Sequence, residues 1–170
     1  MKVDEKIADK VHLRPLRLQD FSRVVVWSRD MEFCFANSWE PSRAEEELYQ
    51  WWANCVNGEI ADFLRIGIEF EERLVGYADL ANIRYGKAEF GIAVGESGLW
   101  GKGVGPAAAR KLLNYAKETL GMTTIFAETH QTNSRSRKML QKLDFQEISR
   151  MGTELYYGEE TGLIQYQKLL

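Results

Sequence analysis

The sequence predicts an α/β protein in which helices cover the faces of a mixed β-sheet, and three observations lead to this fold class. Two segments of alternating apolar and polar residues and a third, KAEFGIAV (Lys87–Val94), follow one another in the middle of the chain. A glycine-rich stretch, WGKGVG, leads from them into a long amphipathic segment. The β-rich TTIFAET (Thr123–Thr129) comes next, as expected for a strand that returns parallel to its sheet through a helix. The expected order is β-α-α-β-β-β-α-β-α-β-β.

The first strand is expected at His12–Leu18, where Pro15 favours a position at the edge of the sheet. Asp20 is a suitable N-cap for a helix that runs through Val24 to Trp27. One strand and one helix therefore open the fold.

A second helix is expected to follow, because Ser42 and Glu45 have the spacing of a capping box. FLRIGIEF (Phe63–Phe70) and LVGYADL (Leu74–Leu80) then alternate on either side of a short turn and predict a β-hairpin. The apolar residues expected on the second helix are Leu48, Trp51 and Trp52.

The second half of the chain begins with an amphipathic helix from Val104, which Gly121 is expected to terminate. After the Thr123–Thr129 strand, a further helix opens near Asn133. Two strands, near Phe145–Ile148 and Leu163–Gln167, are expected at the end, separated by a turn around Gly158.

Composition predicts one domain and excludes several classes of protein. The chain has 170 residues, 45% of them hydrophobic, which suits a single domain at 11–170 behind a flexible arm at 1–10. No apolar run approaches the ~20 residues of a membrane span, and the first ten residues lack the apolar stretch of a signal peptide, so we expect a cytoplasmic protein.

The net charge of −3 argues against a nucleic-acid partner. Cys34 and Cys55 lack the spacing of a metal site, so we expect reduced thiols and no metal.

The glycines of WGKGVG admit more than one interpretation. A glycine-rich turn that opens a helix presents free main-chain N–H groups and suits a phosphate or pyrophosphate, and Pro106 is favourable in a first helical turn. A sharp connection between strand and helix is the simpler interpretation. The spacing does not match an ATP or GTP loop, because Gly103 follows Lys102 where a serine or threonine is needed. Gly103-Val-Gly105-Pro-Ala-Ala108 matches a dinucleotide fingerprint, but several strands precede it.

From Leu13 to about Phe145 the chain resembles the Gcn5-related N-acetyltransferases (GNAT). Their phosphate loop, Gln/Arg-x-x-Gly-x-Gly/Ala, is similar to the stretch from Trp100 to Gly105, with tryptophan in place of the usual first residue. The blocks AEFGI (88–92), NSRS (133–136) and KLDF (142–145) resemble further family motifs, although Asp144 replaces a glycine. The Trp-Gly-Lys-Gly form is similar to the branch of ribosomal-protein alanine and spermidine acetyltransferases.

This resemblance implies acetyl-CoA as cosubstrate. The pyrophosphate is expected on the amides that follow Gly101, and the pantetheine along the strand before the loop, in a V-shaped opening toward Thr124–Thr129. Asn133 and Ser136 are expected to contact the cofactor from the far side, although Asn133 also suits a helix N-cap. The residues expected to bind the cofactor are Ile92, Ala93, Val94, Trp100, Gly101, Lys102, Gly103, Val104, Gly105, Pro106, Asn133 and Ser136.

The chemistry implied by the resemblance is direct acetyl transfer to an amine. Glu89 is the candidate general base, with a solvent-exposed charge as its alternative role. A main-chain amide near Ile92–Val94 is expected to stabilise the oxyanion. Leu140 stands where many family members have a tyrosine that protonates the thiolate, so Ser136 is the candidate substitute. Basic residues after Asn133 suit the 3′-phosphate of the cofactor or a solvated face; they are Arg135, Arg137 and Lys138.

The acceptor is expected to be a primary amine: a polyamine, a small amine or a protein N-terminus. Trp27, Phe33 and Trp39 lie with Glu32 and Glu40 in the region that forms the acceptor wall in this family. Aromatic rings beside carboxylates suit a cationic amine, and core packing is the alternative role for each ring. A module that binds acetyl-CoA without turnover is the alternative function, and a homodimer paired through the C-terminal strands is expected.

Overall fold

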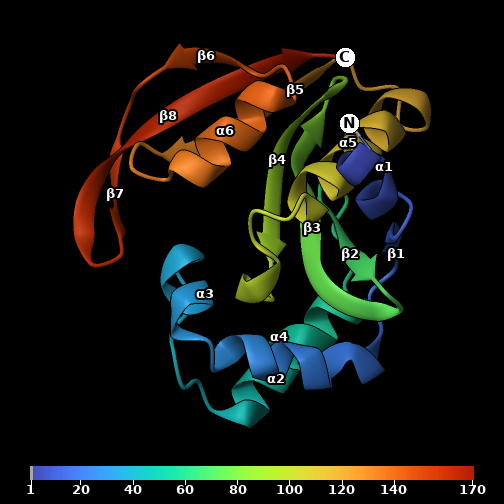
Figure 1. Ribbon diagram of the computed structural model, residues 1–170, viewed down its shortest axis with the longest axis vertical. Helices are drawn as coiled ribbons and strands as arrows, with labels where there is room; N and C mark the ends of the chain where they lie inside the picture. The colour runs from blue at the N-terminus through green and yellow to red at the C-terminus, as the bar shows by residue number, and fades with distance from the viewer. Residues whose placement is uncertain (1) are drawn as a thin grey trace.

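The computed structural model describes residues 2–170 as a mixed eight-stranded sheet with helices on both faces (Figure 1). The strands follow the order β1-β2-β3-β4-β5-β8-β6, and β7 pairs with β8. The helices are α1 (Lys2–Ala8), α2 (Phe21–Ser28), α3 (Met31–Ala36), α4 (Glu45–Asn57), α5 (Val104–Glu118) and α6 (Ser134–Lys142). The strands are β1 (Val11–Arg14), β2 (Leu64–Phe70), β3 (Arg73–Arg84), β4 (Lys87–Val94), β5 (Thr124–His130), β6 (Gln146–Ser149), β7 (Thr153–Tyr156) and β8 (Glu159–Leu169).

The predicted centre of the fold is confirmed. β2 and β3 form the expected hairpin, and β4 has the bounds that the alternation of KAEFGIAV predicted. β4 and β5 are parallel and joined through α5, whereas the other strand pairs are antiparallel. β1 lies at the edge of the sheet as predicted, but it ends at Arg14, before Pro15, and does not extend to Leu18.

The helix before β2 does not begin with the predicted capping box. Ala44 is the N-cap of α4, and Ser42 lies two residues earlier with a left-handed φ of 63°. The first turn contains three glutamates, Glu45 to Glu47, and the positive end of the helix dipole stabilises their negative charges. The prediction for Ser42 was therefore wrong.

Asp20 stands at the N-cap of α2 as predicted, but its carboxylate has other partners. It accepts hydrogen bonds from the Arg17 backbone N–H (2.9 Å) and from both terminal nitrogens of Arg14 (2.8 and 2.9 Å). Arg14 also donates to Glu69 on β2 at 2.5 Å. Arg14 therefore links the edge strand β1 to Asp20 at the start of α2 and to Glu69 on β2.

Three elements were missing from the sequence prediction. α3 begins after Asp30, whose carboxylate accepts from the backbone N–H groups of Glu32 and Phe33 at 3.0 and 3.2 Å. β7 adds a strand to the C-terminal hairpin. Within the segment expected to be a flexible arm, the structure has α1, which packs against α5. The Lys111 ammonium group donates to the Ala8 carbonyl at 2.9 Å.

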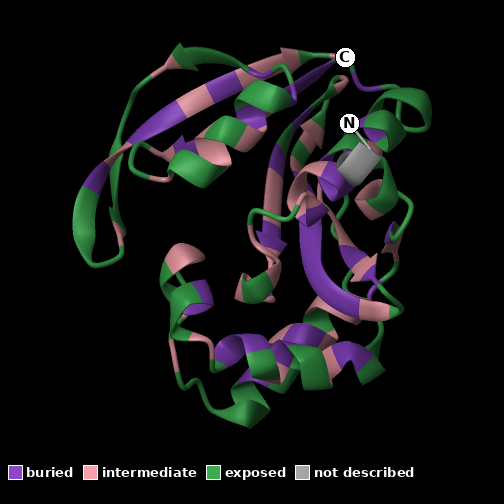
Figure 2. Cartoon of the chain, in the orientation of Figure 1, coloured by how far each residue is buried: buried purple, intermediate pink, exposed green. Residues whose placement is uncertain are grey.

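Two hydrophobic cores lie on opposite faces of the sheet, and buried residues follow its central strands (Figure 2). The first core joins α5 and α6 to alternate residues of β4, including Ala88 and Phe90. The second joins α2, α3 and α4 to Tyr77 and Ala93. Along β4, positions 89, 91 and 93 therefore lie on the sheet face of the second core.

The sheet opens between β4 and β5. The two strands pair only from Lys87 with Thr124 to Phe90 with Ala127. Beyond that point Gly91–Val94 pair with β3 alone, and Glu128–His130 with β8 alone. The predicted V-shaped opening is therefore present, with one main-chain edge of β4 left uncovered.

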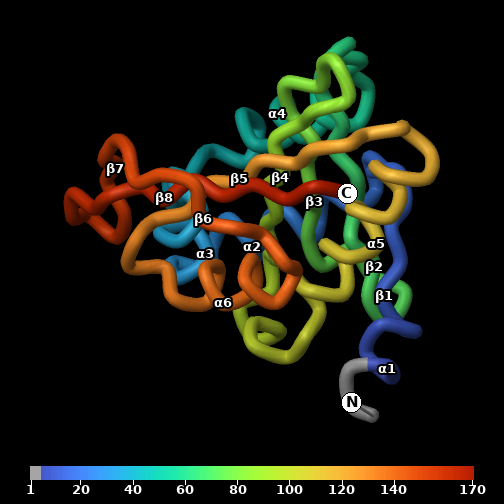
Figure 3. Tube along the Cα trace, turned by 90° about the horizontal axis from the view of Figure 1, so that it is seen from above, coloured from blue at the N-terminus to red at the C-terminus, as the bar shows by residue number. Residues whose placement is uncertain are grey.

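The C-terminal strands extend away from this opening. Figure 3 shows the β7–β8 hairpin projecting at the end of the molecule opposite α5 and β1. The Tyr157 hydroxyl beside β7 donates to the Glu32 carbonyl of α3 at 3.4 Å. Within residues 2–170, no helix is both long and apolar enough to cross a bilayer.

Candidate active site

The glycine-rich loop adopts a conformation that leaves main-chain donors exposed at the start of α5. Gly101 and Gly103 have φ values of 75° and 93°, in the left-handed region that favours glycine. Gly103 is the N-cap, and its carbonyl accepts the first helical hydrogen bond, from the Ala107 N–H at 3.1 Å. Within the described chain, the N–H groups of Gly103, Val104 and Gly105 have no hydrogen-bond partner. Three donors at the positive end of a helix suit a bound anion.

One residue of the loop departs from the expected donor set, and Pro106 was expected to donate nothing. The Lys102 N–H is used within the loop, since it donates to the Leu99 carbonyl at 3.3 Å. Pro106 is the third residue of α5, where its missing N–H costs no helical bond. The available amides are therefore those of Gly103 to Gly105.

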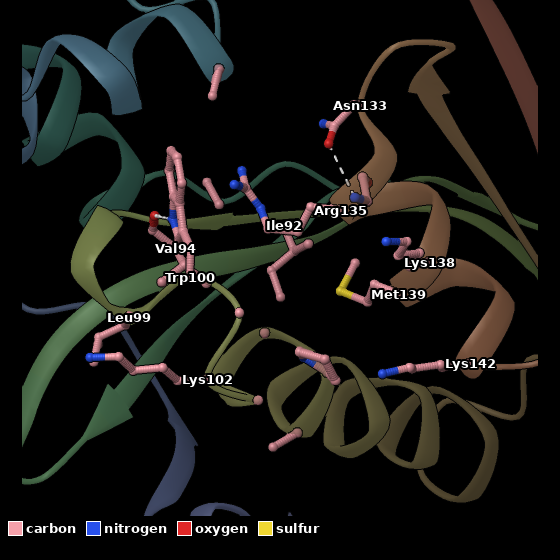
Figure 4. A pocket seen from close by; sticks show the side chains of 18 of the residues that line it. Ile92, Val94, Leu99, Trp100, Lys102, Asn133, Arg135, Lys138, Met139 and Lys142 are labelled. Atoms are coloured by element: carbon pink, nitrogen blue, oxygen red, sulfur yellow. Dashed lines mark hydrogen bonds between the residues drawn. The ribbon is translucent and has the colours of Figure 1, made fainter.

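A cavity of about 680 Å³ lies between this loop, the uncovered edge of β4 and α6, and we call it the cofactor cavity (Figure 4). All the residues expected to bind the cofactor line it except Val104, whose side chain is 1% exposed and packs in the first core. The structure thus brings together the loop, β4 and the start of α6. They are joined there by Ile7, Ala36, Asn37, Leu99, Ala107, Arg110, Arg135, Lys138, Met139 and Lys142.

The charge of the cofactor cavity has one sign. No carboxylate lines it, although the whole chain carries a net charge of −3. The cationic side chains that line it are Lys102, Arg110, Arg135, Lys138 and Lys142. None of the five forms an ion pair among the described residues. In Figure 4, Lys138 and Lys142 extend from α6, whereas Lys102 lies on the opposite side next to Leu99. Such a cavity favours a ligand with several negative charges.

Trp100 links the loop to both sides of the cofactor cavity. Its indole N–H donates to the Val94 carbonyl at the end of β4, at 2.8 Å. The Arg135 guanidinium lies 3.8 Å from the centroid of the Trp100 ring, which is a cation–π contact across the cavity. The departure from the family's usual glutamine or arginine therefore supplies a donor to β4 and a platform for Arg135.

Replacing Trp100 with phenylalanine is expected to lower the free energy of unfolding by about 1 kcal/mol, because the Val94 carbonyl loses its donor. The aromatic contact with Arg135 stays. Urea denaturation of Trp100→Phe, with Trp100→Ala beside it, measures the two contributions. Equal stability of Trp100→Phe and the native protein would contradict this role of the indole N–H.

Asn133 caps a helix, and both Asn133 and Ser136 lie at the cofactor cavity. The Asn133 side-chain oxygen accepts from the Ser136 backbone N–H at 3.1 Å, so Asn133 is the N-cap of α6. Both residues also line the cofactor cavity. Capping and cofactor contact are therefore compatible.

The candidate base does not line the cofactor cavity. Glu89 is exposed on β4, on the sheet face of the second core, and it pairs with Ala81 and Phe126 on the neighbouring strands. Leu140 is 2% exposed within the first core, whereas its neighbour Met139 lines the cofactor cavity. The Leu140 side chain thus does not reach the cavity.

A second cavity, of about 310 Å³, lies beside the first, and we call it the aromatic cavity. Asn37 lines both cavities. Tyr77 of the aromatic cavity is the cross-strand partner of Ala93 in the cofactor cavity. The aromatic cavity is lined by Asn37, Ser38, Trp39, Glu40, Arg43, Trp51, Arg65 and Tyr77.

Of the three aromatic residues expected at the acceptor wall, only Trp39 lines this cavity. Trp27 and Phe33 are buried in the second core and line neither cavity, because the packing of α2 and α3 on the sheet covers them. Glu40 lines the aromatic cavity and Glu32 does not. Burial raises the pKa of Tyr77, so its hydroxyl stays protonated at neutral pH.

Several residues of the two cavities were absent from the sequence analysis. Arg110 lies one helical turn after Pro106, and Lys142 one turn after Lys138, so the i, i+4 spacing was the available signal. Arg65 and Asp79 form a bidentate ion pair on β2 and β3, with both N···O distances at 2.7 Å. Burial lowers the pKa of Arg65, but Asp79 outweighs it and holds the pKa above its ordinary value.

Similarity to known proteins agrees with this geometry. The family model described as "Acetyltransferase (GNAT) domain" matches residues 10–146. The chain is 29% identical over 143 residues to the human "Alpha/beta-tubulin-N-acetyltransferase 9", covering 79% of this chain and 58% of that protein. It is 26% identical over 143 residues to an uncharacterized protein of Methanocaldococcus jannaschii, covering 83% and 29%. The chain thus spans less than two thirds of the length of both relatives.

Solved structures share the whole fold at low identity. The spermidine N-acetyltransferase of Vibrio cholerae, in complex with CoA and spermine, superposes with a TM-score of 0.80 at 19% identity, covering 95% of this chain and 96% of that one. A GNAT-family acetyltransferase of Bacillus anthracis gives a TM-score of 0.79 at 18% identity, covering 94% and 95%. Since the family model spans residues 10–146 of the 170, the chain belongs to the GNAT acetyltransferase family.

Proposed function

We propose that the protein transfers an acetyl group from acetyl-CoA directly to a primary amine. The observation that carries this proposal is the cofactor cavity, where unpaired amides, an uncovered strand edge and five cations meet without a carboxylate. The diphosphate would accept hydrogen bonds from the amides of Gly103 to Gly105. The pantetheine amides would pair with the main chain of Ile92–Val94.

The acceptor amine enters through the aromatic cavity in this proposal. The two cavities meet at Asn37 and at the neighbouring pair of Tyr77 and Ala93, so an amine there would reach a thioester lying along β4. The neutral amine attacks the thioester carbonyl, and a main-chain amide near Ile92–Val94 stabilises the oxyanion. The C–S bond then breaks and CoA leaves as the thiolate. The attacking nitrogen, which carries a positive charge after the attack, gives its second proton to the Ser136 hydroxyl as that hydroxyl passes its own proton to the thiolate.

Glu89 accepts the proton of the incoming ammonium through water. Glu89 lies on the same face of β4 as Ala93, which lines the cofactor cavity, and Gly91 between them has no side chain that would separate the two positions. Ser136, which lines the cofactor cavity, is the proposed proton donor to the thiolate.

Replacing Glu89 with glutamine is expected to lower kcat by about 10²-fold, because general bases contribute about 10²- to 10⁴-fold to such reactions. The KM for acetyl-CoA is expected to stay unchanged, since Glu89 does not line the cofactor cavity. Glu118→Gln, an exposed carboxylate at the end of α5, is the matched control. An unchanged kcat for Glu89→Gln would contradict the role of Glu89 as base.

The transferase activity is tested by release of CoA from acetyl-CoA with a panel of primary amines. The alternative is a module that binds acetyl-CoA without turnover, which the burial of Leu140 in place of a tyrosine favours. Calorimetric binding of acetyl-CoA without CoA release above hydrolysis, for every amine, would favour the module. Release that depends on one class of amine would establish the transferase.

An amine acceptor and an oligomer have further support among the similar proteins. The human relative is named a tubulin N-acetyltransferase, and the Vibrio enzyme is described in complex with spermine and in a dodecameric form. In this chain β6 lies at the open edge of the sheet, where Ile148 is exposed. A homodimer paired through the C-terminal strands therefore stays a prediction.

A further inference from the structure

We propose that Arg65 determines which amines the protein accepts: its guanidinium is a built-in cation of the aromatic cavity and excludes acceptors that carry more than one positive charge. This inference rests on the proposed function and narrows its acceptor class from amines in general to amines with a single ammonium group. A polyamine is thereby excluded as the preferred acceptor.

Arg65 is fixed by its partner on the next strand. The two residues are cross-strand neighbours in the register of β2 and β3. Arg65 Nε and Nη2 each donate to one Asp79 carboxylate oxygen at 2.7 Å, and the two side chains are only 18% and 16% exposed. The planar guanidinium and carboxylate match in a bidentate geometry, which holds the charge in one place.

The aromatic rings that would attract an ammonium group already have a cation beside them. The Arg65 guanidinium carbon lies 4.4 Å from the centroid of Tyr77, 5.2 Å from Phe63 and 5.7 Å from Trp51. All three distances are within the range of a cation–π interaction. The remaining tryptophan of the cavity, Trp39, packs edge-on against Trp51 at 5.0 Å. Of the rings that line the cavity, Tyr77 and Trp51 thus already stabilise an internal cation, whereas Phe63 lies outside the lining.

The other charges of the aromatic cavity leave room for one ammonium group. Its lining contains two cations, Arg43 and Arg65, and one carboxylate, Glu40. The Asp79 carboxylate is engaged by Arg65. A single ammonium group can pair with Glu40, whereas a second one would find no free carboxylate, because Arg65 occupies both oxygens of Asp79, and it would be repelled by Arg43. Like charges in a partly buried site repel more strongly than they do in water, so a polycation binds poorly.

Two acceptors of equal length test this inference. Pentylamine and putrescine (1,4-diaminobutane) have the same number of heavy atoms in the chain, and a methyl group of one replaces the second ammonium group of the other. The native protein is expected to favour pentylamine in kcat/KM by at least about tenfold, since the second charge meets Arg65 without a partner. Equal or higher kcat/KM for putrescine would overturn the proposal.

Variants at position 65 separate charge from structure. Arg65→Met removes the cation and leaves Asp79 beside free aromatic faces, so the preference is expected to reverse in favour of putrescine. Arg65→Lys keeps the charge and is expected to keep the native preference. An Arg65→Met protein that is folded and still favours pentylamine tenfold would overturn the role of Arg65. Should that variant not fold, the native and Arg65→Lys proteins still decide the sign of the preference.

Binding measured without turnover distinguishes this inference from the transferase activity. Each amine is titrated calorimetrically into the native protein saturated with CoA. Tighter binding of pentylamine than of putrescine would support the selectivity even where no amine releases CoA, a result that would end the proposed transferase alone. Conversely, CoA release with tighter binding of putrescine would keep the transferase and overturn the selectivity.

Discussion

Replacing Gly105 with valine is expected to weaken CoA binding by at least about a hundredfold while leaving the fold intact. A β-carbon at this position would lie 3.7 Å from Met139 Sδ and 3.8 Å from Val94 Cγ2, which are ordinary contacts. The β-carbon of an added side chain therefore finds space in the unliganded protein. That space is the cofactor cavity, between β4 and α6, where the diphosphate is proposed to approach the Gly105 amide. Loss of two hydrogen bonds to a charged group, each worth about 1.5–3 kcal/mol, accounts for the expected factor.

Calorimetric titration with CoA and urea denaturation together measure this effect. Gly105→Ala is expected to weaken binding less and to raise stability by about 0.5–1 kcal/mol, since alanine is favoured over glycine in a helix. Gly103→Ala makes a useful contrast, because a φ of 93° strains any other residue and lowers stability as well as binding. CoA binding by Gly105→Val equal to that of the native protein would show that the diphosphate lies elsewhere.

The cofactor cavity was largely predictable because its signals are local in sequence. Glycines at 101 and 103 indicate a left-handed turn, and the change from period 2 to period 3.6 places β4 and α5 on either side of it. Asp144, which replaces the glycine of a family motif, has a φ of 64°, so the backbone keeps the conformation that the motif implies. Asparagine and aspartate tolerate this region better than most residues.

The aromatic cavity was not predictable because its central pair depends on sheet register. A regular hairpin that closes with Phe70 opposite Arg73 would place Arg65 opposite Ala78. A bulge between Ile68 and Glu69 shifts the register by one residue and brings Asp79 there instead. Gly67 and Gly76 inside the two strands are compatible with a bulge, but they do not fix its position or the resulting register. The pairing of Arg65 with Asp79 therefore becomes visible only in the three-dimensional structure.

The sequence did not show which aromatic residues line a cavity and which fill the core. Trp27, Phe33 and Trp39 all lie on or near helices that pack on the sheet, and sequence spacing does not distinguish a ring that faces a cavity from one that fills the core. The structure buries Trp27 and Phe33 and leaves Trp39 half-buried at the aromatic cavity. Capping was ambiguous in the same way, since Asp30 begins a helix and Ser42 does not.

Replacing Gly95 with alanine is expected to lower the free energy of unfolding by about 3 kcal/mol, the largest stability effect of a single methyl group that we predict here. A β-carbon at Gly95 would lie 2.2 Å from two carbon atoms of the Trp27 ring, a distance that requires movement of the ring or the strand. The Trp27 side chain is 1% exposed. The Gly95 N–H donates to the Val75 carbonyl at 2.7 Å, which holds the backbone in place.

The Trp27 ring has little freedom to move away, because it packs against Phe33 and Tyr77 with ring centroids 6.1 and 6.4 Å apart. Close-packed interiors relax only partly around an added group, so the overlap is expected to displace α2 from the sheet. Gly98→Ala is the matched control: a β-carbon there meets nothing within 4 Å, and its stability is expected to stay within about 0.5 kcal/mol of the native value. Urea denaturation of both variants decides the matter. Equal stability of Gly95→Ala and Gly98→Ala would show that the close contact between Gly95 and Trp27 does not constrain the packing of α2 on the sheet.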